Sequence, residues 1–270
     1  RLAGRVGFDE DATSVSSLRK LTEVLPEGAE LVPSNGFVEK LRRTKDAQEI
    51  AAIAEASRLA DEVFEWLAGE GMAGRTERDV AKSAEARMRE LGAEPAFPPI
   101  VGSGPNGALP HSEPSEREIG SGELVVVDMG ARLDGYCSDG TRTWATGGVS
   151  SEARDVYELV HRAQEASLAE IRAGLTGAEA DRISRDPIED AGHSELYGHG
   201  LGHGVGMEVH EAPRLGKTSE DVLGAGDVVT VEPGVYVPGK FGVRIEDLVV
   251  VEDAGFRNLS STSKELLEIG

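Results

Sequence analysis

The stretch Tyr197–Glu211, YGHGLGHGVGMEVHE, concentrates the residue types of the chain that are best suited to chemistry. It holds three of the six histidines, His199, His203 and His210, among five glycines. Imidazole is the commonest metal ligand and the commonest general acid or base near neutral pH. Glycine costs order in regular structure, so a run of glycines indicates backbone that passes close to something. The stretch predicts a site with a histidine at its centre; the alternative is a glycine-rich loop with surface histidines.

A pair of aspartates lies on a predicted β-hairpin upstream. Apolar residues at 123–130 and 136–145 flank the turn sequence LDG, which is typical of a hairpin. If the turn is centred on Leu-Asp, Asp128 lies directly opposite Asp139. If it is centred on Asp-Gly, Asp139 shifts to a diagonal position on the same face. Either register brings the two carboxylates within roughly 5 to 8 Å of each other.

A pair of glutamates lies on a second predicted hairpin. Its strands are the apolar stretches 227–236 and 241–251, which flank the turn sequence VPGKF. Folding this segment about Gly239 places Glu232 opposite Glu246. Like charges directly opposite each other destabilise a β-ladder, so two hairpins that both carry such a pair need an explanation.

Neighbouring carboxylates are stable in a buried place only if their negative charge is neutralised. They can share a proton, or they can bind cations. Two such pairs with an imidazole form an oxygen-rich set suited to two divalent metals, and no loop of the EF-hand type indicates calcium. A two-metal site lowers the pKa of a bridging water and stabilises attacking and leaving oxygens, which predicts hydrolysis. The alternative, solvated surface acids, is disfavoured by apolar strand sequence such as LVVVDMG.

Four separated motifs make the site recognisable. In chain order they are NGALPHS, DMGARLDGYCSDGTRT, HGLGHGVGMEVHEAP and VVTVEPGVYVPGKFGVRIEDLVVV. Together they resemble the pita-bread metallopeptidases of the M24 family, and within it the Xaa-Pro peptidases, aminopeptidase P and prolidase. The likeness covers residues 37–269. It implies a peptidase that hydrolyses the bond between an amino-terminal residue and a following proline, and hence a peptide substrate with proline at the second position.

The resemblance also implies a ligand set. Two divalent metal ions would be held by Asp128, Asp139, His203, Glu232 and Glu246. The hairpin pairing groups the four acids independently, whereas only the resemblance selects His203 from its neighbours. Oxygen-rich ligation and the resemblance favour manganese, with cobalt and zinc as alternatives.

Further roles are implied around the metals. Glu232 would act as the base, His210 would support the scissile carbonyl and its oxyanion, and His111 would contact the leaving side or the substrate carbonyl. His199 would line the pocket and help to seat the proline. Arg244, on the same face of its strand as the last ligand, would orient the acids. Alternatives remain for three of them: His111 as a surface residue, His199 as a structural one and Arg244 as an ordinary ion-pair partner.

Three other functions are alternatives to this hypothesis. A methionine aminopeptidase shares the five ligands, but HGLGHGVG followed by VHE, and the sequence GVRIED, favour the proline-specific branch. A creatinase-like enzyme keeps the fold without the metals. A non-catalytic pita-bread binding protein loses ligands, whereas every ligand position here holds a competent residue.

The elements that must position these residues follow from hydrophobic spacing. It predicts a strand over 97–101 and helices over 45–67, 76–91, 151–173 and 177–191. Thr76 and Ser151 are expected as N-caps, and Pro187 is expected to disturb the last helix. The order helices, hairpin, helices, hairpin indicates an internal pseudo-repeat. Antiparallel strands with helices on one face predict the α+β class, here the pita-bread fold.

Residues 1–36 are too few to fold alone and begin with Arg1 rather than Met. They are similar to the last helix and strand of the creatinase-type amino-terminal domain of the family, most of which is expected to lie outside these residues. The catalytic pita-bread domain is predicted over residues 37–270.

Composition narrows the environment of the protein. The net charge is −21, from 49 acidic and 28 basic residues, which argues against nucleic acid and anionic membranes as partners. Only seven of the basic residues are lysine, so we expect a halophilic surface. The single cysteine, Cys137, is expected in the core and fits a reducing cytoplasm. Relatives commonly dimerise, so a homodimer is a further expectation.

Overall fold

The computed structural model describes residues 3–270 and divides the chain into two compact units, Arg1–Arg42 and Arg43–Gly270. The first unit contains strand β1 (Gly4–Phe8), helix α1 (Val15–Val24) and strand β2 (Ala29–Pro33). Strands β1 and β2 pair in parallel. Helix α2 (Phe37–Arg43) ends where the second unit begins.

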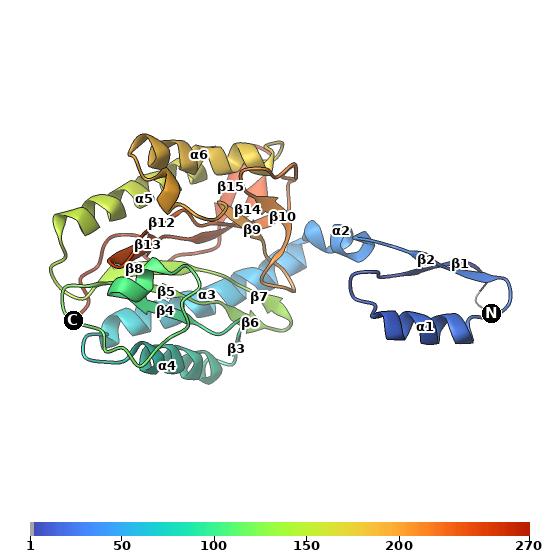
Figure 1. The fold of residues 1–270 in the computed structure, drawn as a ribbon, viewed down its shortest axis with the longest axis horizontal. Helices are drawn as coiled ribbons and strands as arrows, with labels where there is room; N and C mark the ends of the chain where they lie inside the picture. The colour runs from blue at the N-terminus through green and yellow to red at the C-terminus, as the bar shows by residue number, and fades with distance from the viewer. Residues whose placement is uncertain (1–2) are drawn as a thin grey trace. The chain divides into compact units, whose positions relative to one another are not determined.

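The second unit contains four long helices and thirteen strands (Figure 1). The helices are α3 (Ala47–Glu70), α4 (Glu77–Glu90), α5 (Ser151–Glu170) and α6 (Gly177–Asp190). The first group of strands, with one 3-10 helix, is β3 (Glu94–Pro95), β4 (Ile100–Ser103), η1 (Gly104–Ala108), β5 (Leu124–Asp128), β6 (Ala131–Leu133), β7 (Tyr136–Cys137) and β8 (Thr141–Ala145). The second group is η2 (Ser194–Leu196), β9 (Gly202–Gly204), β10 (Glu211–Leu215), β11 (Val228–Val231), β12 (Gly234–Val237), β13 (Phe241–Arg244), β14 (Asp247–Glu252) and β15 (Gly255–Asn258).

Side-chain caps decide where the helices begin. Asp46 and Glu49 form a capping box at the start of α3, and Thr76 caps α4 as predicted. The prediction of Ser151 as the cap of α5 is wrong by one residue, because the hydroxyl of Ser150 accepts the hydrogen bond from the backbone N–H of Ala153.

Helix α6 continues through its proline to Asp190. A proline inside a helix removes one backbone donor, and here a buried face that includes Ile188 keeps the helix packed. The predicted interruption is therefore absent from this described helix.

The predicted pseudo-repeat is visible in the helices. Thr76 and Thr176 cap α4 and α6, and each also forms an isolated antiparallel bridge, to Glu118 and to Val222. In both halves a glycine with positive φ lies two residues before the cap, Gly74 at 80° and Gly174 at 93°. Two copies of one helix–strand arrangement therefore make up the second unit.

All strand pairs of the described part of the second unit are antiparallel. The main sheets have the orders β4-β5-β8 and β10-β9-β11-β14-β15, with the hairpin β12-β13 packed on β5 and β8. Helix α3 packs on β6 and β7 and α4 on β4, whereas α5 packs on β13 and α6 on β10. The predicted α+β class is confirmed.

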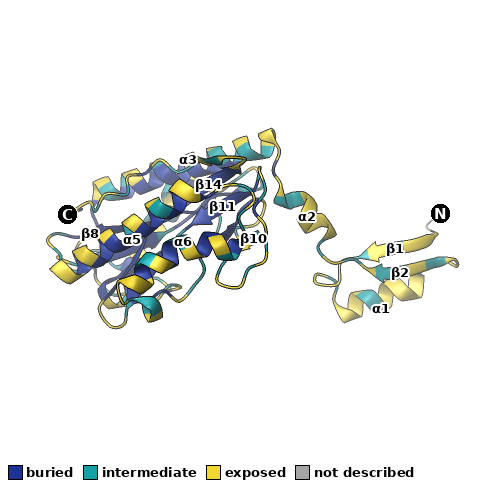
Figure 2. Cartoon of the chain, turned by 90° about the horizontal axis from the view of Figure 1, so that it is seen from above, coloured by how far each residue is buried: buried dark blue, intermediate teal, exposed yellow. Residues whose placement is uncertain are grey.

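The core lies between the helices and the strands (Figure 2). In the first half Phe64 and Leu67 of α3 pack with Val127 and Trp144. In the second half Leu168 of α5 and a residue of α6 pack with residues of β10, β11 and β14. Cys137 is buried, as predicted. No helix of the described residues is long and apolar enough to cross a membrane.

Candidate metal centre and active site

The turn of the first hairpin decides where its two aspartates lie. Asp134 and Gly135 both have positive φ, 50° and 90°, and form the turn between β6 and β7. Asp-Gly tolerates this left-handed pair of positions, which suits the twist of a hairpin. Of the two predicted registers, the one centred on Asp-Gly therefore forms, and Asp128 pairs with Thr141. Direct pairing of Asp128 with Asp139 is wrong.

The second hairpin has the predicted register. Val231 pairs with Asp247 in β11–β14, and Gly234 pairs with Arg244 in β12–β13, so Glu232 and Glu246 occupy matching positions between them. The two long predicted strands are each interrupted at the glutamate, which separates β11 from β12 and β13 from β14. Pro233 follows Glu232 and has no N–H for a ladder hydrogen bond, which is one reason for the break.

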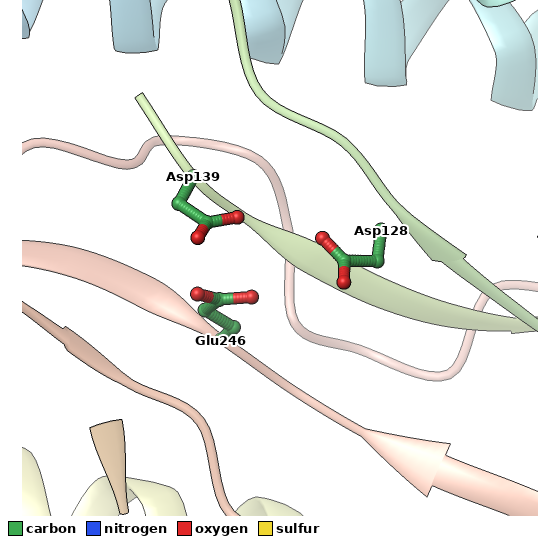
Figure 3. A group of neighbouring side chains, drawn as sticks. All are labelled: Asp128, Asp139 and Glu246. Carbon is green, nitrogen blue, oxygen red and sulfur yellow. The ribbon is translucent and has the colours of Figure 1, made fainter. Parts of the chain in front are cut away.

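The two hairpins bring three carboxylates together. Oxygens of Asp128, Asp139 and Glu246 all lie within 4.8 Å of one another, and Figure 3 shows the three side chains facing the same space. The halves are joined directly beside them, because the backbone N–H of Glu246 donates to the carbonyl oxygen of Thr141 at 3.1 Å. The hydroxyl of Thr141 donates to Glu246 Oε2 at 2.6 Å.

His203 and Glu232 complete the predicted ligand set on the other side. His203 Nε2 lies 3.2 Å from Glu232 Oε1 and 3.7 Å from Asp139 Oδ2. Strand β9 can approach β11 this closely because Gly202 has no side chain: a Cβ there would lie 2.1 Å from the carbonyl oxygen of Thr230. The glycines of the histidine stretch thus let an imidazole reach the acids.

Burial and mutual repulsion dominate the electrostatics of the cluster. Burial raises the pKa of Asp139 well above its ordinary value, and the neighbouring charges of Glu246 and Asp128 raise it further. Burial and the charges of Glu232 and Asp128 likewise raise the pKa of Glu246. Against the effect of burial, the hydrogen bond and charge of His203 lower the pKa of Glu232 to about 2. The acids cannot all be ionised together unless a cation lies among them.

Two carboxylate oxygens have the environment that a cation requires. Asp128 Oδ1 and Glu246 Oε1 are buried and receive no hydrogen bond from any described residue. A buried carboxylate oxygen without a donor is costly, and a divalent cation would satisfy both oxygens at once. The residues present therefore fit divalent metal ions.

Arg244 is tied into the cluster rather than to a surface partner. Its Nη2 donates to Asp128 Oδ2 at 2.6 Å, and its Nε donates to the hydroxyl of Thr141 at 3.0 Å. Its Nη1 donates to the hydroxyl of Tyr236 at 2.8 Å, and that hydroxyl lies 2.8 Å from His199 Nε2. A continuous polar chain therefore connects Asp128 to His199.

Sequence reasoning missed Tyr236, although a signal was present. In the register of the second hairpin Tyr236 pairs with Gly242, which places it diagonally beside Arg244 on the same face.

All nine residues singled out from the sequence line one cavity of about 450 Å³. The ring of His210 lies 4.2 Å from that of His203, centroid to centroid, and burial, with the charges of His203 and Arg214, lowers its pKa. Burial also lowers the pKa of His199. His111 is exposed and lies at the rim of the cavity.

The remaining lining residues add an apolar wall and a cation. Phe97, Ile100, Val209 and Leu215 supply apolar surface, and Arg214 is the cation that sequence reasoning did not single out. An open cavity with an acid cluster at its base and an apolar wall can hold a peptide end beside bound cations.

The fold and the site together define a class of protein in which two hairpins bring an acid cluster that fits divalent cations to one cavity. Residues 51–253 match the family model described as metallopeptidase family M24, and the chain belongs to that family. The family implies divalent metal ions, and the acid cluster is where the residues fit them.

Named relatives support the same assignment. The peptidase YqhT of Bacillus subtilis, itself uncharacterised, is 42% identical over 264 residues, which cover 97% of this chain and 74% of YqhT. The Xaa-Pro dipeptidase of Pyrococcus furiosus is 42% identical over 231 residues, 85% of this chain and 66% of that protein.

Solved structures agree with the sequences. The Xaa-Pro dipeptidase from Bacillus anthracis has a TM-score of 0.96 at 43% identity, covering 98% of this chain and 74% of that one. The X-Pro aminopeptidase from Thermotoga maritima has a TM-score of 0.93 at 35% identity, covering 98% and 75%. The predicted pita-bread fold of the family is confirmed. This chain spans about three quarters of the length of these two proteins.

Proposed function

We propose that this chain is a metal-dependent exopeptidase that hydrolyses the bond between an amino-terminal residue and a following proline. The observation that carries the proposal is the convergence of two acid-bearing hairpins and the histidines on one cavity. The similarity to Xaa-Pro dipeptidases and to an X-Pro aminopeptidase supports the specificity.

In this proposal Asp128, Asp139, His203, Glu232 and Glu246 hold two divalent cations. Bound cations would polarise the scissile carbonyl and lower the pKa of a water molecule. The predominance of carboxylate oxygens favours manganese, with cobalt and zinc as the alternatives. The positive amino group of the substrate is attracted to the negative side chains of the same cluster.

Glu232 is the proposed general base. Its low pKa, about 2, keeps the carboxylate ionised, and its Oε1 is held by His203 and by the hydroxyl of Thr230 at 3.0 Å. The carboxylate takes a proton from the attacking water and delivers it to the proline nitrogen as the peptide bond breaks.

The histidines are proposed to orient the substrate. Because burial disfavours its charged form, His210 is neutral near pH 7, and a ring N–H can donate to the scissile carbonyl oxygen as negative charge develops there. His111 contacts the leaving side or the substrate carbonyl from the rim. His199, fixed by Tyr236, seats the proline ring, and Arg244 orients Asp128.

The cavity also accounts for the second residue of the substrate. Proline lacks an N–H and has a fixed φ, so it requires shape rather than a backbone acceptor. The apolar wall that includes Phe97 and Val209 suits its ring, and Arg214 would bind a carboxylate when proline is the last residue. This favours a dipeptide over a longer peptide.

The test is turnover of Ala-Pro, Ala-Pro-Ala and Met-Ala by purified protein, after chelation and after separate addition of Mn²⁺, Co²⁺ and Zn²⁺. We expect Ala-Pro to be cleaved only with added metal, and most rapidly with Mn²⁺. Glu232→Gln should lower kcat by about 10³-fold without unfolding the protein, because it removes the base. The exposed residue Glu220 supplies the matched control, Glu220→Gln.

Each other outcome has a definite meaning. Cleavage of Met-Ala alone would identify a methionine aminopeptidase-like enzyme. Failure to cleave any peptide with any metal would identify a non-catalytic binding protein. Full activity after exhaustive chelation would refute the metal centre.

The domain assignment is also a proposal. We assign residues 1–36 to a creatinase-type amino-terminal domain and residues 37–270 to the catalytic domain; the strand–helix–strand order of β1, α1 and β2 supports the first assignment. A cytoplasmic location, supported by a single buried cysteine, and a homodimer are further proposals, which fractionation and light scattering test.

A further inference from the structure

Glu77 is a fully buried acid that the proposed reaction does not use. It is the first residue of α4 and has a relative exposure of 0%. A charged side chain in such a place must be fully hydrogen-bonded, because an unpaired buried charge is very costly. Its partners therefore indicate what it does.

Five donor groups converge on the Glu77 carboxylate. The backbone N–H and hydroxyl of Ser103 donate to Oε1 at 2.8 and 2.7 Å. The side-chain amide of Asn106 donates to Oε2 at 2.9 Å. The backbone N–H and hydroxyl of Ser115 donate to Oε2 at 3.1 and 2.6 Å. Burial raises the pKa of Glu77, but these bonds outweigh it and lower the pKa below its ordinary value.

The donors bracket one loop. Ser103 and Asn106 lie at the start of the segment 103–115, and Ser115 lies at its end. Between them the segment carries His111, at the rim of the cavity. One carboxylate thus holds both ends of the loop from which a proposed substrate-contacting histidine projects.

The middle of the loop is held separately on the catalytic face. Arg244 Nη1 donates to the carbonyl oxygen of Pro110, directly before His111, at 3.2 Å. Gly107 lies against β13, since a Cβ on Gly242 would be 1.9 Å from the Gly107 carbonyl oxygen. The loop is therefore held at both ends by Glu77 and in its middle by Arg244 and β13, beside the cavity that Pro110 and His111 line.

We propose that Glu77 is a positioning residue that sets the place of His111 at the cavity mouth. The inference rests on the proposed function for His111 and extends it to a residue on the far side of the loop. A glutamine of the same shape would present an amide N–H₂ to some of the donors, so at least one end of the loop would be released. His111 would then spend less time in its productive position.

The test is a double-mutant cycle with metal-loaded protein and Ala-Pro as substrate. We expect Glu77→Gln to lower kcat/KM about tenfold in the otherwise native chain. In the His111→Ala background the same substitution should change kcat/KM less than about twofold, because the group that Glu77 positions is already absent. Glu90→Gln is the matched control, since Glu90 is exposed on the same helix.

A structural role gives a different result. If Glu77 only stabilises the fold, Glu77→Gln lowers kcat/KM equally in both backgrounds, and the proposal is overturned. An unchanged kcat/KM in the native background overturns it too. Should Glu77→Gln fail to fold, Ser115→Ala removes one of the donors to Glu77, with the acceptor for Asn106 and the Arg117 N–H, and must show the same coupling to His111.

Hydrogen exchange separates this proposal from the proposed function. The amides of Leu109 and Ser112 bond within the loop, to Asn106 and Leu109 carbonyl oxygens. We expect both amides to exchange at least about tenfold faster in Glu77→Gln and to be unchanged in Glu90→Gln. If wild-type protein cleaves no Xaa-Pro peptide, the proposed function is refuted, and hydrogen exchange alone then tests the role of Glu77. Unchanged exchange in Glu77→Gln refutes the role of Glu77.

Discussion

The hydroxyl of Tyr236 connects residues that the sequence placed in different roles. It accepts a hydrogen bond from Arg244 and lies 2.8 Å from His199, so the residue proposed to orient Asp128 and the residue proposed to seat the proline share one partner. A change at this hydroxyl should therefore act on both.

We predict that Tyr236→Phe lowers kcat/KM for Ala-Pro about tenfold and lowers stability by about 2 kcal/mol, because it removes the partner of His199 Nε2 and one of the two acceptors of Arg244 Nη1. Steady-state kinetics and urea unfolding measure the two effects. Tyr157→Phe is the control. The hydroxyl of Tyr157 also donates a hydrogen bond in the core, to the carbonyl oxygen of Lys264, but Tyr157 lies outside the cavity. This variant should therefore be less stable but keep its kcat/KM. Equal kinetics for both variants would contradict the prediction.

Glu77 also makes a prediction about pH. Its pKa in the folded state is lowered, so its contribution to stability is present above the ordinary glutamate value of 4.5 and is lost as the pH falls through the folded-state value. The difference in unfolding free energy between wild type and Glu77→Gln should be about 2 kcal/mol at pH 7 and should shrink below pH 4.5. Urea unfolding across this range measures it; a difference that grows in acid would have the wrong sign.

At the scale of single residues, residue type and spacing were enough to predict many of the side chains that line the cavity. The four acids could be grouped from the hairpins, because each pair is local in sequence. Thr141 and Tyr236 could not be found by looking for groups with acid–base or ligand chemistry, since their importance comes from the neighbours that folding gives them. Arg214 was missed because an exposed arginine has no sequence signal that separates it from a solvated one.

At the scale of elements, turn chemistry set the registers. Asp134 and Gly135 accept positive φ and select one of two pairings that hydrophobic pattern alone left open. The interruptions at Glu232 and Glu246 were not predicted, because the apolar residues farther along each strand suggest continuous strands; only Pro233 signals one of the breaks. The contact between the hairpins could not be predicted from local sequence pattern either, because it joins residues about a hundred positions apart.

The loop that carries His111 depends on the close approach of two glycines. We predict that Gly242→Ala destabilises the protein by about 3 kcal/mol and lowers activity, because the new Cβ would lie 1.9 Å from the carbonyl oxygen of Gly107 and must displace the loop. Thermal unfolding and Ala-Pro turnover check both effects. Gly69→Ala in α3, where a Cβ meets no atom within 4 Å, should be neutral or slightly stabilising. Similar effects of both substitutions would contradict the steric argument.

At the scale of the whole molecule, charge is the dominant feature. A net charge of −21 on 270 residues produces self-repulsion that salt screens, and we propose halophilic adaptation as its cause. We predict that the melting temperature of metal-loaded protein rises by at least about 10 °C between 0.1 M and 3 M KCl. Calorimetry measures the shift. Sucrose at matched osmolality is the control for stabilisation by any solute that is excluded from the protein surface. A melting temperature independent of KCl would refute halophily and leave an ordinary acidic protein.

The pairing of the hairpins limits how the sequence of this molecule can change. Successive side chains of a strand point to opposite faces of the sheet. Inserting or deleting one residue in either turn would therefore move one acid of a pair away from the other, although all four acids would still be present. The distance along the chain between the two acids of each hairpin is therefore under the same constraint as the acids themselves. Variation in length among descendants of this chain should be confined to segments outside the hairpins, such as the connection between β8 and α5.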